Sequence, residues 1–309
     1  MKVQCPLCKS DRQKLIEILK VSDIISLYKR ELGEDCSHLF HEQFIEYYEC
    51  SDCSLLHFSP MVAGDEKMYK RLQQFSWYYS DEKEEYSIAK QFLTDFFNLN
   101  ISVLEVGSGK GAFRSFLKEN DKYVGLEFSQ EAILLAEKNN VELYQETIEN
   151  YVEKHFGIYD VVCSFQVLEH VTTPRTFIES SITALKPGGI LIIAVPSEDD
   201  LMKVLVNNFY NMPPHHLTRY SDKTLESIAK LFDLELVSIK HDSISREQLY
   251  INAYNSLQHK LLKYKLLDLS LKRTLIRNLC KIICKIFRIT NKKICKGTTV
   301  VAFYRKKQN

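Results

Sequence analysis

This sequence of 309 residues contains few glycines, has a formal net charge of only +1 and lacks long apolar runs. No uncharged apolar stretch approaches the roughly 18–20 residues that a membrane-spanning helix needs. The first residues, MKVQCPLCKSD, do not contain the apolar segment of a secretory signal. With 10 glycines, 7 prolines and 45% hydrophobic residues, the composition excludes collagen-like, low-complexity and disordered proteins. The length predicts one large domain or two smaller ones.

The balance of 41 basic against 40 acidic residues conceals an uneven distribution of charge. From residue 255 to the end, 15 lysines and arginines face a single acid, Asp268, so residues 1–254 carry an acidic excess. A basic end on an acidic body indicates an anionic partner for that end, or self-association. The acidic body makes nucleic acid a less favoured partner, and the oligomeric state is left open.

Nine cysteines are present, and four of them form two C-x-x-C pairs, Cys5/Cys8 and Cys50/Cys53. An odd count with this spacing indicates a reducing, cytoplasmic location and a metal site rather than a disulfide framework. Two such turns supply four thiolates in a tetrahedral shell, which selects zinc and leaves no open coordination position. We therefore predict a structural zinc ribbon over residues 1–60; unmetallated thiols or a redox pair are the alternatives.

The remaining cysteines do not have this spacing. Cys163 is expected to be a small buried residue of a strand. Between the two C-x-x-C pairs stand three other possible ligands, Cys36, His38 and His41, to which no metal is assigned. The same holds for the cysteines of the basic end, Cys280, Cys284 and Cys295.

Strand-like and helix-like segments alternate from residue 101 onward. Short apolar runs stand at Val103–Val106, Tyr123–Leu126, Val141–Tyr144, Val161–Phe165 and Ile190–Val195. Helical stretches are expected between them, at Gly111–Glu119, Gln130–Asn139 and Arg175–Leu185. This alternation predicts a doubly wound α/β domain over residues 99–254, with mostly parallel strands covered on both faces.

The flanking regions complete the predicted organisation. Residues 61–98 are expected to form a helical connector, residues 255–296 a basic helical insertion, and residues 297–309 the last strand of the core sheet (Thr298–Tyr304) and a tail. In the connector, the aromatic cluster at Trp77, Tyr78 and Tyr79 could close over a ligand, but packing of a helix onto the core is the preferred interpretation.

A glycine-rich turn follows the first of these strands, in the stretch VLEVGSGKGAF from Val103 to Phe113. Glycines let the backbone turn sharply and approach a ligand closely. Glu127 stands at the end of the next strand, where a carboxylate can accept both hydroxyls of a ribose. The spacing is G-x-G-x-G after an acid, not the G-x-G-x-x-G of dinucleotide sites; a purely structural turn is the alternative.

Four stretches in this order resemble the successive motifs of class I S-adenosylmethionine-dependent methyltransferases: VLEVGSGKGAF, the acid in YVGLEF, YDVVCSFQVLEHV (159–171) and LKPGGILIIAVPS (185–197). The stretch from 142 to 162 is similar to the ubiquinone-type O-methyltransferase branch. The resemblance implies a Rossmann-like core with a seven-stranded, mostly parallel sheet. The N-terminal part resembles a group of such enzymes that carry a zinc ribbon and are assigned to glycan or small-molecule biosynthesis.

The resemblance also assigns residues to S-adenosylmethionine. Glu105 would order the turn near the amino group of the methionine part, and Glu127 would bind the ribose. The other implied cofactor contacts are the turn residues Gly107, Ser108 and Gly109, the adenine-side residues Thr147 and Ile148, and the methionine-side residues Phe165 and Gln166.

Methyl transfer from a sulfonium is an in-line displacement, so the protein mainly aligns the acceptor with the methyl carbon. A hydroxyl or carbon acceptor must also lose a proton, and histidine is the usual base near neutral pH. We expect this role at His216, then His215, in a proline-stiffened loop, or at His170 after the fourth strand. Alternatively, His170 is a helix-start residue bonded to the backbone.

The basic insertion is expected to contain an amphipathic helix. Basic residues recur at helical spacing at Arg273, Arg277, Lys281, Lys285, Arg288 and Lys292, beside an apolar stripe at Leu275, Leu279, Ile282, Ile283 and Ile286. The preferred interpretation packs the apolar side on the domain and leaves the basic residues in solvent. Peripheral contact with an anionic membrane is the functional alternative.

Together these features predict an enzyme that transfers a methyl group from S-adenosylmethionine to a hydroxyl or carbon of a small molecule or glycan intermediate. Two alternatives stay open, namely an RNA methyltransferase and a non-catalytic S-adenosylmethionine-binding protein.

Overall fold

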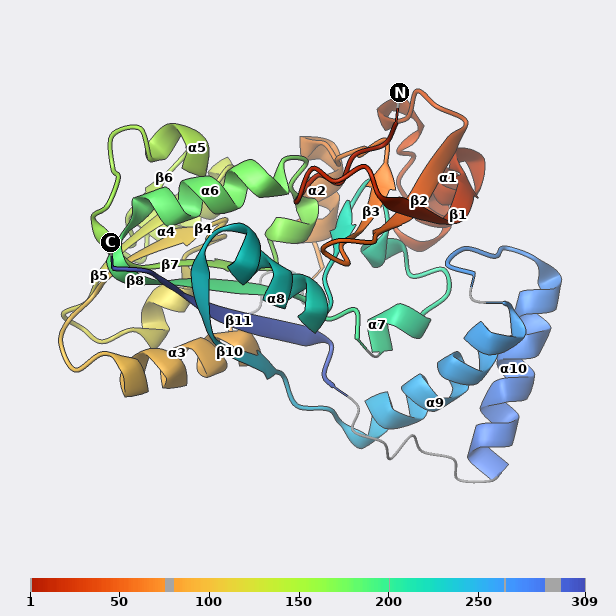
Figure 1. The fold of residues 1–309 in the computed structure, drawn as a ribbon. Coiled ribbons are helices and arrows are strands. Elements are labelled where there is room, and N and C mark those ends of the chain that lie inside the picture. Colours follow the sequence, from red (N-terminus) through yellow and green to blue (C-terminus); the bar gives the residue numbers. More distant parts are fainter. Residues whose placement is uncertain (1, 76–80, 200, 264, 287–295, 309) are drawn as a thin grey trace.

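The computed structural model of the chain describes residues 2–75, 81–199, 201–263, 265–286 and 296–308. Its two sheets lie side by side, with a helical hairpin projecting from them (Figure 1). The aromatic cluster predicted at Trp77, Tyr78 and Tyr79 lies outside the described residues.

The larger sheet has seven strands in the order β10-β11-β8-β7-β4-β5-β6. Their bounds are β4 Ser102–Val106, β5 Lys122–Leu126, β6 Leu143–Tyr144, β7 Tyr159–Phe165, β8 Leu185–Pro196, β10 Leu234–His241 and β11 Thr299–Lys306. The strands β8, β7, β4, β5 and β6 run parallel, whereas β11 is antiparallel to both β8 and β10. The predicted mostly parallel sheet and the return of the last strand are both confirmed.

Both faces of this sheet are covered. Since consecutive residues of a strand point to opposite sides, neighbouring residues of one strand enter different cores. Val162 and Leu191 face a core formed with α6 (Pro174–Ala184) and α8 (Asp222–Leu231). Val161 and Ile190 face the opposite core, formed with α3 (Glu84–Phe96). The remaining core helices are α4 (Gln130–Glu137), α5 (Ile148–Tyr151) and the short α7 (Leu201–Val204).

The helix predicted at Gly111–Glu119 is wrong in type and length. This segment is a short 3-10 helix, η2 (Ala112–Phe116), that ends in an extended residue, Leu117. The guanidinium of Arg114 donates to the carbonyls of Lys118 and Glu119 at 3.1 and 2.9 Å, which holds the following residues in a loop.

The smaller sheet is antiparallel and has the order β1-β2-β3-β9. Its strands are β1 Gln13–Lys20, β2 Phe44–Cys50, β3 Leu56–Ser59 and β9 Thr218–Arg219. The helix α1 (Val21–Glu31) belongs to this N-terminal part, and α2 (Glu66–Gln73) lies in the connector. Since β9 comes from the predicted core, the N-terminal sheet is not confined to residues 1–60.

The insertion is a hairpin of two helices, α9 (Arg246–Leu261) and α10 (Leu271–Ile286), and it begins before the predicted boundary at residue 255. Cys280 and Cys284 are buried against Ala253 and Tyr254 of α9. Among the described residues, no helix is long and apolar enough to cross a membrane.

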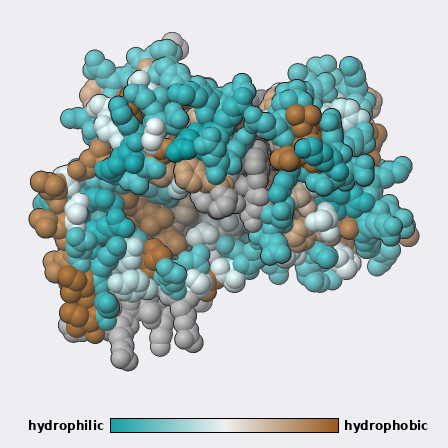
Figure 2. Space-filling model, turned by 180° about the vertical axis from the view of Figure 1, so that it is seen from behind, coloured by the Kyte–Doolittle hydropathy of each residue, from teal (hydrophilic) through white to brown (hydrophobic). Residues whose placement is uncertain are grey.

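The preferred packing of α10 is wrong. Its apolar stripe is exposed, at Leu271, Leu275, Leu279, Ile282 and Ile286, and forms part of the hydrophobic surface on the left of Figure 2. Two of its basic residues instead contact the protein: Arg273 donates to the carbonyl of Val206 at 3.2 Å, and the Lys281 ammonium lies 5.2 Å from the centre of the Tyr254 ring. Lys272 and Lys285 are exposed beside the apolar stripe.

Candidate active site

The glycine turn lies between the carboxyl end of β4 and η2, and it needs glycine for two reasons. Gly107, Gly109 and Gly111 all have positive φ, between 54° and 74°, which favours glycine. A β-carbon at Gly107 would also stand 2.5 Å from a methyl group of Val167. The Gly107 and Ser108 amides donate to the carbonyl of Leu126 at 2.8 and 3.0 Å, so the turn is fixed to the end of β5.

Glu105 belongs to β4, two residues before Gly107, and is 1% exposed. The Tyr123 hydroxyl donates to its carboxylate at 2.5 Å. Burial raises the pKa of Glu105 to about 8, although this hydrogen bond opposes the shift. No sequence pattern indicated Tyr123 as a residue of the site. Because Tyr123 is the cross-strand partner of Val103, two residues before Glu105, its place follows once the register of β4 and β5 is known.

Glu127, predicted to bind a ribose, stands at the end of β5 beside the turn. Its carboxylate accepts three backbone hydrogen bonds, from Gly109 at 2.7 Å and from Phe128 and Ser129 at 2.8 Å each. Both strand ends therefore meet at this one charged group, on the side where ligands bind in open α/β sheets.

The two predicted adenine contacts follow β6 at the start of α5. Thr147 caps that helix, because its hydroxyl accepts the amide of Asn150 at 3.1 Å. The Ile148 side chain is buried in the core. What this segment presents toward a ligand is thus mainly its backbone.

The two predicted methionine-side contacts end β7. Phe165 is buried, with its ring 4.9 and 4.8 Å from the rings of Tyr86 and Phe113, so its side chain is part of the core. Gln166 has a φ of 59°, and its amide donates to the carboxylate of Glu85 at 3.4 Å. Sequence reasoning did not identify Glu85 or Tyr86, because neither belongs to a recognisable motif.

Residues 81–83, just before α3, lie next to the glycine turn. Asp81 and Lys110 form an ion pair at 2.7 Å across the turn. The charge of Lys83 is near enough to favour the ionised forms of Glu105 and Glu169. This cationic cover was also not predicted, since one lysine in a charged segment gives no recognisable pattern.

The three predicted histidines do come together. His170 ends η3 (Leu168–His170), just after β7, and its ring centre lies 4.5 and 4.8 Å from those of His215 and His216. Their candidate ligand nitrogens all lie within 4.8 Å of one another. With Glu169, which is 1% exposed, they form what we call the histidine cluster. Burial lowers the pKa of His170 to about 4 and raises that of Glu169 to about 8.

The histidine cluster adjoins the glycine turn through one residue. Val167, which packs on Gly107, directly precedes η3. Every residue from 211 to 220 is buried, including both loop histidines, whereas the His170 side chain keeps 17% exposure. Of the predicted alternative for His170, only the backbone bond is observed: its Nδ1 bonds the carbonyl of His215 at 2.7 Å, but His170 ends η3 and does not start a helix.

The N-terminal part supports this loop directly. The Tyr28 hydroxyl accepts the amide of His215 at 3.3 Å, and the amide of Phe58 donates to the carbonyl of Leu217 at 3.1 Å. Next in the chain, β9 adds to the edge of β3. The loop that carries two of the three histidines is therefore held between the two sheets.

A buried ion pair anchors the same loop. Arg219 lies 2.7 Å from the carboxylate of Glu198, and the two side chains are 2% and 6% exposed. The guanidinium also lies 5.6 Å from the centre of the Tyr47 ring of β2. Neither partner was predicted, because the interaction joins elements that are distant in the sequence.

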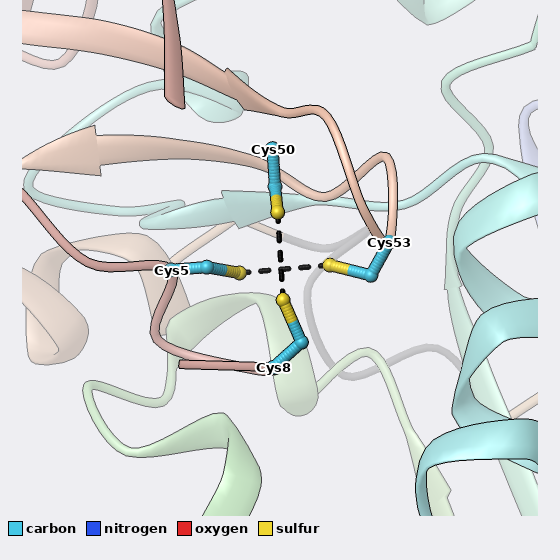
Figure 3. A group of neighbouring side chains, drawn as sticks. All are labelled: Cys5, Cys8, Cys50 and Cys53. Carbon is cyan, nitrogen blue, oxygen red and sulfur yellow. Dashed lines mark hydrogen bonds between the residues drawn. The ribbon is translucent and has the colours of Figure 1, made fainter. Parts of the chain in front are cut away.

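The four predicted cysteine ligands converge in the N-terminal part (Figure 3). The sulfurs of Cys5 and Cys53 are 3.5 Å apart, those of Cys8 and Cys50 are 3.4 Å apart, and all four lie within 4.8 Å of one another. A tetrahedral shell with zinc–sulfur bonds of 2.3 Å has sulfur–sulfur edges of about 3.8 Å. The spacing therefore fits a zinc ion.

The two C-x-x-C turns have the same backbone geometry. In each, the amide of the first cysteine donates to the carbonyl five residues on, as Cys5 does to Ser10 and Cys50 to Leu55. The residue after each second cysteine, Lys9 or Ser54, has a positive φ near 60°. Two matching turns that face each other explain how distant segments form one tetrahedral group.

Comparisons with known proteins agree with this geometry. A family model described as a methyltransferase domain matches residues 78–239, slightly more than half of the chain. Ubiquinone biosynthesis O-methyltransferases from Sodalis glossinidius (strain morsitans) and Cronobacter sakazakii (strain ATCC BAA-894) are 35% and 36% identical over 95 and 94 residues. Each match covers 28% of this chain and 38% or 39% of the relative, so the chain spans well under half of their length.

A solved structure shares the fold at low identity. The plantazolicin methyltransferase BpumL, determined in complex with SAH, aligns with a TM-score of 0.50 and 16% identity over 79% of this chain and 91% of that one. Together with the sheet order, the acid before the glycine turn and the family match, this places the chain in the class I S-adenosylmethionine-dependent methyltransferase family.

Proposed function

We propose that this protein transfers a methyl group from S-adenosylmethionine to a hydroxyl or carbon of a small molecule or glycan intermediate. The observation that carries the proposal is the meeting of Glu105, the glycine turn and Glu127 at the carboxyl ends of β4 and β5. The names of the relatives support an oxygen acceptor, since they are O-methyltransferases. The bound SAH of BpumL supports the cofactor.

The chemistry requires alignment and removal of one proton. The sulfonium is already a good leaving group, so the acceptor atom needs a direct line to the methyl carbon. We assign removal of the acceptor proton to the histidine cluster, with His216, His215 and His170 as the groups involved. Its link to the glycine turn through Val167 supports this role.

Replacing Glu127 with alanine tests cofactor binding. We expect S-adenosylmethionine affinity to fall by about 1–3 kcal/mol, because a charged acceptor of hydrogen bonds is lost. The measurement is calorimetric titration, with Glu137→Ala as control, since Glu137 is an exposed carboxylate in α4. Unchanged affinity in Glu127→Ala would mean that the ribose is held elsewhere. Absence of heat in the unaltered protein at millimolar ligand would indicate a non-catalytic scaffold.

A structural zinc ion in the cysteine cluster is part of the proposed function. Cys5, Cys8, Cys50 and Cys53 would hold it, and four thiolates leave no open position for substrate. Three of these side chains are at most 2% exposed, which suits an ion that stabilises the fold. The ion would join β2 to the N-terminal turn and, through the pairing of β3 with β9, support the loop of the histidine cluster.

We also propose that α10 contacts an anionic membrane surface. Its exposed apolar stripe supports this, together with the 15 basic residues against one acid from residue 255 onward. An apolar stripe flanked by lysine and arginine can enter the headgroup region, where anionic lipids attract the basic residues.

The double variant Leu275→Glu/Leu279→Glu tests this contact. We expect the protein to float with vesicles that contain phosphatidylglycerol and the variant to lose most of that binding, because two carboxylates oppose both insertion and anionic lipid. Leu99→Glu is the matched control, since Leu99 is 81% exposed on the core domain. Equal flotation of the double variant, or equal binding to pure phosphatidylcholine, would contradict the proposal.

A further inference from the structure

The histidine cluster has the donor arrangement of a metal site. His170 Nδ1 bonds the carbonyl of His215 at 2.7 Å, and His215 Nδ1 bonds the carbonyl of Tyr210 at 2.8 Å. A carbonyl can only accept, so both Nδ1 atoms carry the proton and both Nε2 atoms keep a free lone pair. Carbonyl partners that fix the tautomer in this way are typical of histidines that ligate metals.

The tautomer of His216 depends on the side-chain amide of Asn211, and without an ion the hydrogen bonds to Arg219 favour the orientation that leaves the proton on Nε2. The Nδ1 of His216 lies 3.0 Å from the side-chain amide of Asn211, whose other end can face Arg219. With the amide oxygen toward His216, Nδ1 donates and Nε2 is free to bind a cation. With the amide turned over, the oxygen serves Arg219 and Nε2 carries the proton. A cation in the cluster would select the first orientation.

The acid of the cluster is buried without a partner. Among the described residues, neither carboxylate oxygen of Glu169 has a hydrogen bond, and the same holds for His215 Nε2. One Glu169 oxygen lies 3.9 Å from the Nε2 atoms of both His170 and His216. Burying a carboxylate without hydrogen bonds is costly unless a cation compensates it. A cation held among these groups would compensate both the carboxylate and the unbonded nitrogen.

We propose that the histidine cluster binds a divalent transition-metal ion through His170, His215 and His216, with the carboxylate of Glu169 beside the ion as its compensating charge. Three protein ligands leave a fourth coordination position open for substrate. Imidazole nitrogens favour borderline ions such as Zn²⁺ or Fe²⁺ over Mg²⁺ or Ca²⁺. The site differs from the cysteine cluster in ligand chemistry and in place. It lies where β7 ends, and Tyr69 of α2 packs on two of its rings at 5.9 and 6.2 Å between centres.

This inference rests on the proposed function and gives the histidine cluster a specific way to perform its part. A divalent ion lowers the pKa of an oxygen bound to it. An acceptor hydroxyl on the ion would release its proton to water, and the oxygen lone pair would attack the methyl carbon. The carbon–sulfur bond breaks, and its electron pair stays on sulfur as the neutral thioether of S-adenosylhomocysteine.

Metal content is the decisive measurement. The full-length protein is equilibrated with Zn²⁺, desalted and analysed by elemental mass spectrometry. We expect two zinc ions per chain in the unaltered protein and one in His170→Asn and in His215→Gln. His155→Ala is the control and should keep two zinc ions. His155 also bonds a carbonyl through Nδ1, but it lies between α5 and β7 and does not belong to the histidine cluster. One zinc in the unaltered protein, or two in both cluster variants, would overturn the inference.

Cobalt distinguishes the two sites and guards against misfolding. Co²⁺ on four thiolates gives strong sulfur-to-metal charge-transfer bands, whereas Co²⁺ on imidazole and oxygen ligands gives only weak d–d bands. We expect the cluster variants to lose the weak bands and keep the charge-transfer bands, which shows an intact cysteine cluster. If the cluster variants instead lost the charge-transfer bands and kept the weak bands, the ion that they lose would be the one bound by thiolates, which would contradict the proposal.

The outcome is separable from that of the proposed function. A protein that holds one zinc but binds S-adenosylmethionine and forms S-adenosylhomocysteine would refute the metal site and leave methyl transfer standing. A protein that holds two zinc ions but gives no heat with S-adenosylmethionine would do the reverse.

Discussion

Replacing Cys50 with serine is expected to release the zinc ion proposed for the four-cysteine group and to unfold the N-terminal sheet. Cys50 is fully buried at the end of β2, and its sulfur lies 3.4 Å from that of Cys8. Binding of zinc to four-ligand sites contributes on the order of 10 kcal/mol to the folding of small domains. Loss of one thiolate removes much of this, so the unfolding midpoint in urea should fall sharply.

The matched control is Cys36→Ser. Cys36 is also buried in the N-terminal part, at 3% exposure, but it does not belong to the cysteine cluster. This variant should keep its zinc and lose only the small packing contribution of one thiol. If Cys36→Ser releases zinc while Cys50→Ser retains it, the ligand set is wrong. If both retain zinc and stability, the ion is held elsewhere.

The second large effect is expected at Arg219. Changing Arg219 to methionine leaves the carboxylate of Glu198, which is 6% exposed, without its partner. Removing one member of a buried ion pair costs about 3–5 kcal/mol, because the remaining charge has neither water nor a counter-ion. Burial already raises the pKa of Glu198, and loss of the arginine should raise it further. Because the folded variant then holds the proton more tightly than the unfolded chain does, its stability should fall as the pH rises.

Two comparisons isolate this effect. The double variant Arg219→Met/Glu198→Gln should recover much of the lost stability, because it removes both charges. Arg30→Met, in the ion pair of Arg30 with Glu31 at 52% and 43% exposure, should cost less than about 1 kcal/mol. Urea midpoints measure all three variants. Equal stability of Arg219→Met and Arg30→Met would mean that the buried pair has no special weight.

Several parts of the fold could be predicted because their causes are local. The runs at Val103–Val106 and Ile190–Val195 are apolar without alternation, which is what strands buried on both faces require. The C-x-x-C turns likewise contain their own geometry, since each is closed by hydrogen bonds within six residues. In these segments the sequence pattern and the final structure depend on the same few neighbours.

Other parts depend on distant partners and could not be predicted. The two residues of β9 show no periodicity, and they pair with β3 only because the fold brings them together. The orientation of α10 was predicted wrongly for a related reason. Cys280 and Cys284 pack on α9, and this contact, which the pattern of the helix alone does not reveal, turns the leucines outward.

The histidines are an intermediate case. Their position after β7 and in the proline-stiffened loop placed all three at one edge of the sheet. The carbonyl partners of His170 and His215, which set their tautomers, are backbone atoms that any sequence would supply. Residue types therefore indicated a site, whereas the chemistry of each nitrogen required coordinates.

The pairing of β3 with β9 constrains the order in which the protein is made. Ribosomes deliver the chain from its N-terminus, and domains generally fold as they emerge. The strands β1 to β3 emerge early, but their sheet gains its last strand only after residue 219 has been synthesised. The edge of β3 therefore stays unpaired while residues 60–219 are synthesised, and early binding of zinc would protect the N-terminal sheet from aggregation during that interval.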